Sequence, residues 1–402
     1  MFPGSVQVDV TGLMVAQPPG RQLRPDGVCW HTPGVRVLIC PDKFAGTLSA
    51  PEVAQAIADG WAVPSDELIR LPIADGGPGF VDVLATALDG RRIPVHTVDP
   101  LGRPARGEIL YANGTAYVES AQACGLHLLT REERNPNTTT SYGLGLLLAA
   151  AVETGAAQVV VGLGGSAVND AGAGMLAALG AAPVDAAGYA LPYGGAPLIT
   201  AAALTGPPRL RQVALVAATD VDNPLTGLHG ASNVFGPQKG ATRDDVLRLD
   251  AALEHFAAVL EQAFGLEDLA TRPGAGAAGG LGAALIALGA RVTSGIGLVS
   301  ELIGLNRELD AADLVITGEG SFDHQSLRGK VVAGIAAGAR DRGLPCVVLA
   351  GRNETGHREA SAAGVTETHT LVQHFGSVAT AMAEPARGLR ELAGRLSRQW
   401  SR

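Results

Sequence analysis

Short apolar runs alternate with polar loops and amphipathic segments along the chain. Residues 36–40 form an apolar run that predicts a buried strand, and Ser49 and Glu52 have the spacing of a capping box that begins a helix. Apolar residues then recur at helical spacing as far as Trp61, and a second strand is predicted over residues 68–74. This order of strand, helix and strand predicts a βαβ unit with parallel strands.

The same order returns near the other end of the chain, with a strand at 313–317, a loop at 318–327, a helix at 330–342 and another strand at 345–350. Because parallel βαβ units can extend a common sheet, we expect both chain ends to build one α/β domain, with a second α/β domain inserted between them. The expected limits are 35–90 with 291–385 for the first domain, 91–290 for the inserted domain, 1–34 for a flexible leader, and 386–402 for a C-terminal helix or tail.

The middle of the chain repeats the pattern of strands, glycine loops and helices. Strands are predicted at 158–161 and 212–218, and a helix at 170–180. Thr242 has the position of an N-cap before a long amphipathic helix. A glycine-rich stretch, 273–282, opens a further helix. These units place the middle of the chain in the same α/β class as its ends.

Composition narrows the class of protein. Apolar residues make up 47% of the 402 residues and charged residues 17%, which suits a large buried core. The net charge of −9, without a basic stripe, argues against a nucleic-acid partner. The longest uncharged stretch, 186–208, is broken by prolines, so no membrane partner is expected. Four scattered cysteines suit a reducing compartment, and we expect a cytoplasmic protein.

Carboxylates follow two of the predicted strands. Asp75 comes after the strand at 68–74 and precedes two glycines, and Asp220 and Asp222 follow the strand at 212–218. Ligands of open α/β sheets bind outside the carboxyl ends of the strands. Carboxylates at that edge suit Mg²⁺ binding or proton transfer, although Asp-Gly is also ordinary turn chemistry.

A glycine loop over residues 162–166 follows the strand at 158–161. Such a loop can present a nest of N–H groups to an anion, beside a carboxamide and a carboxylate. Its candidate ligand-binding residues are Gly164, Gly165, Ser166, Asn169 and Asp170. The loop also fits a G-x-G-x-x-A dinucleotide pattern, so an NAD-dependent dehydrogenase stays open as an alternative.

Three lysines add positive charge: Lys43 and Lys239 in loops, and Lys330 at the start of the helix predicted at 330–342. Lys43 precedes the N-terminus of a predicted helix, which attracts anions. Glu319 and Asp323 follow the strand at 313–317, in the same loop that leads to Lys330. Valine follows Gly329-Lys330 where a Walker A motif requires serine or threonine, so the P-loop class is excluded.

Seven blocks stand in one order along residues 35–355: Pro41-Asp-Lys-Phe-Ala-Gly-Thr-Leu-Ser49, Ala74-Asp-Gly-Gly, Gly162-Leu-Gly-Gly-Ser-Ala-Val-Asn-Asp-Ala-Gly-Ala-Gly, Asp220-Val-Asp-Asn-Pro-Leu-Thr-Gly, Phe235-Gly-Pro-Gln-Lys-Gly-Ala-Thr, Pro273-Gly-Ala-Gly-Ala-Ala-Gly-Gly-Leu-Gly, and Thr317-Gly-Glu-Gly-Ser-Phe-Asp with Gly329-Lys330. Together they resemble the bacterial glycerate kinases that phosphorylate the 2-hydroxyl. The resemblance implies ATP and Mg²⁺ as cosubstrates, D-glycerate as the small-molecule acceptor and 2-phosphoglycerate as the product. It also implies two α/β domains, one Rossmann-like with a parallel sheet built from both chain ends, and a site in the cleft between them.

On this basis we assign hypothetical roles to the candidate residues. The catalytic set is Lys43, Asp75, Asp170 and Lys330, with Asp75 or Asp170 as the general base. The nucleotide-binding set is Gly164, Gly165, Ser166, Asn169, Lys239 and Glu319. The metal-binding set is Asp220, Asp222 and Asp323. Glu319 is an alternative candidate for the same metal-binding role.

Three positions depart from the family pattern. Ala45 stands where the family often has lysine, Pro78 where it often has glutamate, and Ser321 where it often has arginine. These changes remove charges near the expected site. A non-catalytic binder of glycerate or nucleotide therefore stays open as a second alternative. The sequence leaves open which hydroxyl is phosphorylated and the oligomeric state.

Overall fold

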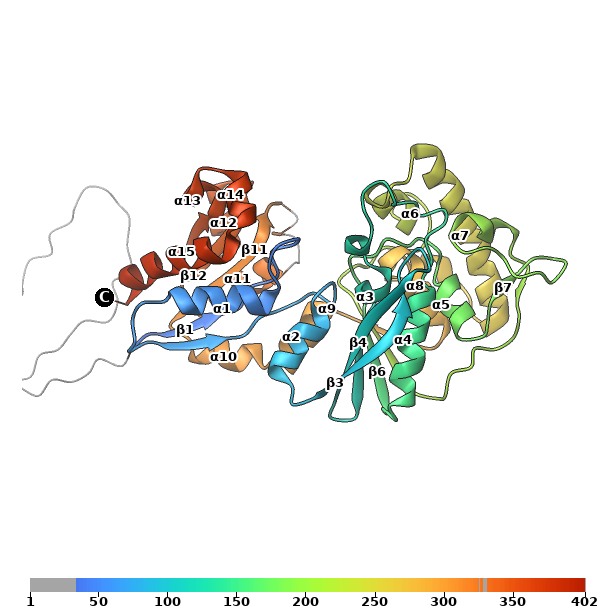
Figure 1. Ribbon diagram of the computed structural model, residues 1–402, viewed down its shortest axis with the longest axis horizontal. Helices are drawn as coiled ribbons and strands as arrows, with labels where there is room; N and C mark the ends of the chain where they lie inside the picture. The colour runs from blue at the N-terminus through green and yellow to red at the C-terminus, as the bar shows by residue number, and fades with distance from the viewer. Residues whose placement is uncertain (1–33, 325, 328–330, 402) are drawn as a thin grey trace, which may run out of the picture.

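The computed structural model describes residues 34–324, 326, 327 and 331–401. Its strands form two main sheets, which lie in two parts of an elongated molecule (Figure 1). The predicted leader, apart from Gly34, lies outside the described residues. Lys330 also lies outside them. Among the described residues, no helix is both long and apolar enough to cross a membrane.

The first sheet has five parallel strands that come from both ends of the chain, as predicted. Its strands, in spatial order, are β13 (Glu367–Thr370), β12 (Cys346–Asn353), β11 (Leu314–Phe322), β1 (Arg36–Ile39) and β2 (Glu67–Arg70). Numbered along the chain, this is the 2-1-3-4-5 order of the flavodoxin-like doubly wound class. In that class the strand order reverses between the first and third strands, here β1 and β11, and ligands bind outside their carboxyl ends.

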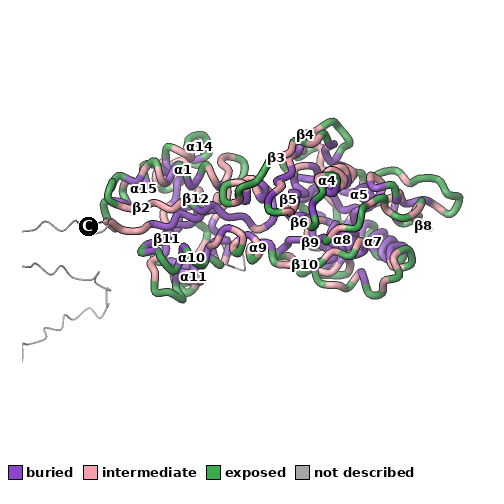
Figure 2. The backbone as a smooth tube through the Cα atoms, turned by 90° about the horizontal axis from the view of Figure 1, so that it is seen from below, coloured by how far each residue is buried: buried purple, intermediate pink, exposed green. Residues whose placement is uncertain are grey.

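Helices cover both faces of the first sheet. Val37 and Ile39 lie in one core, whereas Leu38 and Cys40 lie in the core on the opposite face, because side chains alternate along a strand. The first core includes α1 (Ala50–Gly60), α13 (Leu371–Phe375), α14 (Val378–Ala383) and α15 (Pro385–Trp400), and the second includes α10 (Leu305–Ala311), α11 (Val331–Arg340) and α12 (His357–Ala362). Figure 2 shows β11 and β12 as buried segments between these layers.

The second sheet is mixed. Its strands, in spatial order, are β10 (Arg291–Thr293), β9 (Ala214–Ala218), β6 (Gln158–Gly162), β5 (Thr115–Glu119), β4 (Pro104–Ala112) and β3 (Arg91–Val98). The pairs β3–β4 and β4–β5 are antiparallel, and the remaining pairs are parallel. A separate short hairpin joins β7 (Pro183–Val184) and β8 (Ala203–Leu204).

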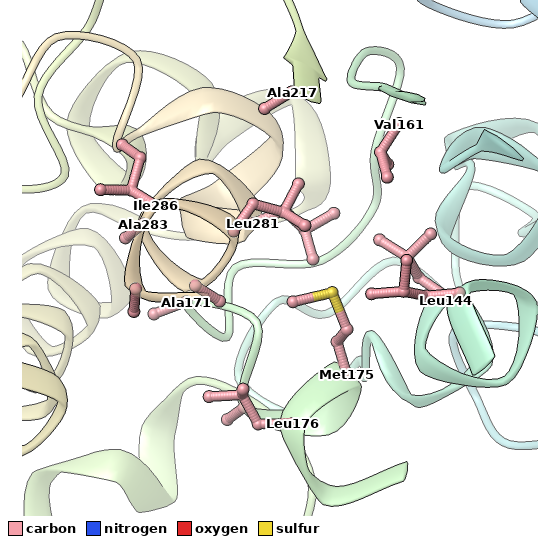
Figure 3. Close-up of a cluster of buried hydrophobic side chains, with 14 of the residues drawn as sticks. Leu144, Val161, Ala171, Met175, Leu176, Ala217, Leu281, Ala283 and Ile286 are labelled. Carbon is pink, nitrogen blue, oxygen red and sulfur yellow. The ribbon is translucent and has the colours of Figure 1, made fainter. Parts of the chain in front are cut away.

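One face of the second sheet packs against a helical layer. The helices of this core are α3 (Ala121–Cys124), α4 (Tyr142–Glu153), α5 (Ala173–Ala178), α6 (Ala231–Phe235), α7 (Arg243–Phe264) and α8 (Ala277–Ala287). Figure 3 shows Leu144, Met175 and Leu281 from three of these helices near the sheet residue Val161.

Two helices connect the sheets. These are α2 (Phe80–Ala87) and α9 (Gly295–Leu302). Phe80 packs edge-on against Tyr117 of the second sheet, with ring centroids 6.3 Å apart. Phe80, Tyr117 and Val299 belong to the same continuous core as Leu38 of the first sheet. The carboxyl ends of strands from both sheets therefore approach one another across α2 and α9. The domain limits themselves stay a proposal, and β10, just past the expected limit at 290, pairs with the second sheet.

Local predictions differ in outcome. The capping box at Ser49 is confirmed, since Ser49 accepts a bond from the Glu52 N–H and its own N–H donates to the Glu52 carboxylate. The predicted loop at 318–327 was wrong in part, because β11 keeps pairing with β12 as far as Phe322. The helix predicted at 170–180 is shorter, because Ala171 and Gly172 have φ values of 47° and 72°, which a right-handed helix excludes.

Candidate active site

Two glycine loops meet where the sheets approach one another. One loop follows β2 and contains Asp75, Gly76 and Gly77, and the other follows β6. A Cβ atom on Gly164 would lie only 2.7 Å from the Cα atom of Gly77, so this approach requires glycine. The Gly77 N–H donates a hydrogen bond of 3.0 Å to Asp75 Oδ1. The carboxylate of Asp75 is thereby held beside the glycine loop that the sequence singles out.

The start of α9 brings Asp220 to the same place. A Cβ atom on Gly295 would lie 2.2 Å from the carbonyl oxygen of Asp75 and 3.2 Å from Asp220 Oδ2. Ser294 Oγ donates to Asp220 Oδ1 at 2.6 Å, and the Ile296 N–H donates to Oδ2 at 2.9 Å. Partial burial and the nearby carboxylate of Asp75 raise the pKa of Asp220. Asp220 therefore stabilises the N-terminus of α9, while it adds negative charge beside Asp75.

Lys43 lies in the loop after β1, at the switch point of the first sheet. The Asp42 N–H donates to the carbonyl of Gly318 at 2.8 Å, which ties this loop to β11. Lys43 Nζ is 3.4 Å from Asp42 Oδ1. Burial lowers the pKa of Lys43, but the carboxylates of Asp42, Asp75 and Glu119 together outweigh it, so the pKa is raised. A persistent ammonium thus stands among three carboxylates.

Glu119 is a buried site residue that the sequence interpretation missed. It ends β5 and is 5% exposed, and the N–H groups of Gly79 and Val81 at the start of α2 donate to it, the latter at 3.2 Å. Burial raises the pKa of Glu119 to about 7, against the opposing effect of these donors and of Lys43. The same signal that identified Asp75, an acid at the end of an apolar run, was available for Glu119.

Asp170 is enclosed within the second part of the molecule. Its carboxylate accepts hydrogen bonds from the N–H and Oγ of Ser141 at 2.9 and 2.8 Å, and from the N–H groups of Gly172 and Gly174 at 3.1 and 3.2 Å. Burial raises the pKa of Asp170. With four donors and no exposed surface, this carboxylate holds the segment after the glycine loop in place.

Lys239 is also buried, on the inner side of the glycine loop. Its Nζ donates to Ser166 Oγ at 3.1 Å and to the carbonyl of Val168 at 2.6 Å. Burial lowers the pKa of Lys239 to about 7, although the carboxylate of Asp170 opposes this shift. The neighbouring Asn169 donates to Ser232 Oγ at 2.9 Å, and among the described residues its Oδ1 atom has no hydrogen-bond partner. Ser166, Asn169 and Lys239 therefore support the loop from within.

A pocket of 480 Å³ opens at the switch point between β1 and β11. Its polar lining includes Asp42, Lys43, Glu319 and Asp323. Its apolar lining comes from α13 and α14 and the start of α15, through Leu371, Val372, Val378, Ala381, Met382 and Pro385. Of the predicted residues, the structure thus brings Lys43, Glu319 and Asp323 together here. A separate pocket of 450 Å³ near the end of α7 has no charged lining residue and lies apart from these groups.

The candidate metal ligands lie in different places. Asp220 lies in the loop after β9 and accepts a hydrogen bond from the start of α9, Asp222 is exposed in the same loop, and Asp323 lines the pocket. Within residues 34–324, 326, 327 and 331–401, no group of three or more histidine, cysteine or acidic side chains is placed to hold a metal ion. The metal-binding roles of these three residues stay predictions, and Lys330 lies outside the described residues.

The positions that depart from the family pattern also lie at this site. Ala45 and Ser321 line the pocket, and Arg352 of β12 lines it beside Ser321. Pro78 covers the glycine loop, because a Cβ atom on Gly165 would lie 2.8 Å from Pro78 Cγ. The departures therefore change the lining of the site and leave its backbone framework in place.

A doubly wound parallel sheet has a lysine at its switch point, and carboxylates and a glycine loop from a second sheet lie near the same strand ends. This arrangement defines an α/β protein whose charged groups gather at the edge where such sheets bind ligands. Comparison with known proteins identifies its family. The family model described as "Glycerate kinase family" matches residues 37–401. The chain therefore belongs to the glycerate kinase family and is a kinase.

Individual relatives agree with this assignment. The chain is 41% identical over 356 residues to a glycerate kinase of Halalkalibacterium halodurans, covering 87% of this chain and 93% of that one. It is 43% identical over 325 residues to glycerate 2-kinase of Escherichia coli, covering 79% and 85%. A crystal structure of a protein described as glycerate kinase 2, from Salmonella typhimurium LT2, matches with a TM-score of 0.74 and 37% identity, covering 91% of this chain and 98% of that one.

The alternatives from the sequence gain no support. A dinucleotide pattern requires its glycine loop to open directly into a helix. Here the loop ends at Ser166, and α5 begins only at Ala173. The comparisons name kinases, which supports neither a dehydrogenase nor a non-catalytic binder.

Proposed function

We propose that the enzyme transfers the γ-phosphoryl group of ATP to the 2-hydroxyl of D-glycerate, giving 2-phosphoglycerate and ADP. The names of the related enzymes support this acceptor. The structural observation that carries the proposal is the position of Lys43, which lines the switch-point pocket and also interacts with Asp75. A cation at this junction can neutralise a phosphoryl group as it passes from nucleotide to acceptor.

Asp75 is our candidate for the general base. In the reaction, the acceptor hydroxyl oxygen bonds to the γ-phosphorus, the bond from that phosphorus to ADP breaks, and the hydroxyl proton moves to the carboxylate. Asp75 is only partly buried and accepts a hydrogen bond from the Gly77 N–H. Asp170 is fully enclosed by four donors, which favours a structural role for it.

The glycine loop is our candidate for binding an anionic group through its backbone. Gly164, Gly165 and Ser166 lie against the Asp75 loop, where their N–H groups can form a nest. Lys239 and Asn169 act indirectly in this proposal, because both are buried behind the loop and bond to its neighbours.

Mg²⁺ is the metal expected with ATP. In nucleotide sites it is held by one or two protein carboxylates together with phosphate oxygens. The carboxylates of Glu319 and Asp323 on the pocket wall fit such a donor set without a preformed cluster. The ion would supply neutralisation of phosphate charge when bound.

Two other properties of the chain support a cytoplasmic location and a small-molecule substrate. The described cysteines, Cys40, Cys124 and Cys346, are buried free thiols, which suits a cytoplasmic enzyme. The net charge of −9 supports a small-molecule substrate over nucleic acid.

The experiment that tests this function measures ADP release from Mg-ATP by the purified protein, with D-glycerate compared against a panel of other hydroxy acids. We expect ADP release that depends on D-glycerate and saturates with it. Preference for a different acid would overturn the substrate, and absence of turnover with every acid would overturn the reaction.

A further inference from the structure

The switch-point pocket has an apolar wall that the phosphoryl-transfer chemistry does not explain. Val378 and Met382 are large apolar side chains that are 61% and 55% exposed. They are four residues apart on α14, so they lie on the same face of that helix, and both line the pocket. A pair of exposed apolar side chains beside a charged pocket points to a ligand with an apolar part.

This wall is fixed by the fold. Thr370 Oγ1 accepts the Gln373 N–H at 3.1 Å and caps α13, and Ser377 Oγ accepts the Thr380 N–H at 3.3 Å and caps α14. Leu371 and Ala381 of these helices are 1% and 6% exposed and belong to the core of the first sheet. The exposed side chains therefore stand on a preformed support.

We propose that the α13–α14 wall binds the purine base of the nucleotide, with the phosphates directed toward Lys43. This inference rests on the proposed function, and it assigns the two substrates to opposite sides of Lys43. A nucleotide combines an apolar base with a charged tail, which matches a pocket lined by Val378 and Met382 as well as by Lys43 and Asp323. Glycerate is a small polar acid whose binding an apolar wall would not strengthen. We therefore place it on the other side of Lys43, next to Asp75.

The size and place of the pocket support this assignment. At 480 Å³ it lies in the range of about 300–1,000 Å³ typical of cofactor pockets and has room for more than a three-carbon acid. It opens outside the carboxyl ends of β1 and β11, where doubly wound sheets bind nucleotides. The remaining wall, at Glu319 and Asp323, faces the same space.

The test introduces a negative charge into the wall. We expect Val378→Asp and Met382→Glu each to weaken ADP binding, measured by titration calorimetry, about tenfold or more, because a carboxylate disfavours both the base and the phosphates. Met382→Gln, which lacks the charge, should weaken binding less. The KM for glycerate should stay within about twofold. Leu247→Glu is the matched control, since Leu247 is 69% exposed on α7 outside the pocket.

Each outcome decides the proposal. ADP affinity within twofold of the unaltered protein in both charged variants would overturn it, as would absence of ADP binding to the unaltered protein. Thermal melts of both variants show whether the fold is kept, which we expect because the altered side chains are exposed. Since ADP binding is measured without an acceptor, loss of affinity in the variants alongside inactivity on glycerate would refute the proposed substrate and keep the nucleotide subsite.

Discussion

Arg352 on β12 donates a hydrogen bond from its Nε atom to Oγ of Ser321 on β11, at 3.0 Å. The two residues are direct partners in the parallel register, and both line the switch-point pocket. Ser321 is one of the positions at which the sequence resemblance to the family implies a lost cation. The neighbouring strand thus supplies a guanidinium beside the position where the sequence suggests a lost cation.

We predict that Arg352→Ala lowers kcat/KM for ATP about tenfold, because a guanidinium near phosphate contributes a charge-assisted bond. The melting temperature should hardly change, since the ion pair of Arg352 with Glu354 is exposed. Steady-state kinetics over a range of ATP concentrations measure the effect. Exposed Arg358, which is outside the pocket lining, provides the control Arg358→Ala. The double variant Ser321→Arg with Arg352→Ser should recover activity, and kinetics unchanged by Arg352→Ala would contradict the assignment.

Lys43 should be required for turnover. Lys43→Met leaves Asp42, Asp75 and Glu119 without their shared cation, so we expect kcat to fall about 10²–10³-fold. Lys43→Arg keeps the charge and should retain more activity than the methionine variant. Turnover at saturating Mg-ATP and glycerate measures both. Equal, undiminished kcat in the two variants would remove Lys43 from the mechanism.

Two aspartates give a paired test of chemistry against structure. We expect Asp75→Asn to lower turnover about 10²–10⁴-fold with little loss of stability, as for a general base. Asp170→Asn should instead lower the free energy of unfolding by about 1–3 kcal/mol, because an amide replaces a buried carboxylate that accepts four bonds. Turnover and urea unfolding of each variant separate the two roles. Full turnover in Asp75→Asn would leave that carboxylate without a catalytic role.

The local framework of the site could be predicted from the sequence, whereas the roles of its residues depend on more than local patterns. The apolar run at 36–40 and the capping box at Ser49 depend on local periodicity and hydrogen bonding, and the structure has both. The roles of Asp170 and Lys239 depend on which side of the glycine loop a side chain takes. That choice follows from tertiary packing, which no local pattern encodes.

Glu119 was missed for the same reason, because its surroundings depend on tertiary packing. It stands at the end of an apolar run in the sequence, as Asp75 and Asp220 do, yet only the pairing of β5 with β6 brings it beside the N-terminus of α2 and near Lys43. The extension of β11 to Phe322 likewise depends on its partner strand β12.

The pH dependence of stability should reveal Glu119. Burial raises its pKa in the folded protein from 4.5 to about 7, so between these values the folded protein binds a proton that the unfolded chain releases. The contribution of Glu119 to the stability of the folded protein is complete below about pH 4.5 and is lost as the pH rises through about 7. The free energy of unfolding of Glu119→Gln, relative to that of the unaltered protein, should therefore rise by up to about 2–3 kcal/mol between pH 5 and 8.

Urea unfolding at a series of pH values measures this difference. The control Glu153→Gln removes an exposed carboxylate of α4 and should leave the pH dependence unchanged. Parallel pH profiles for Glu119→Gln and the unaltered protein would show that Glu119 does not titrate in this range.

The most direct test of the proposed reaction couples the product to enolase, which accepts 2-phosphoglycerate and not 3-phosphoglycerate. The purified enzyme is incubated with Mg-ATP and D-glycerate, and phosphoenolpyruvate formation is followed after enolase is added without a phosphoglycerate mutase. We predict phosphoenolpyruvate in proportion to the ADP released. ADP release without phosphoenolpyruvate would place the phosphoryl group on another hydroxyl and contradict the proposed 2-kinase activity.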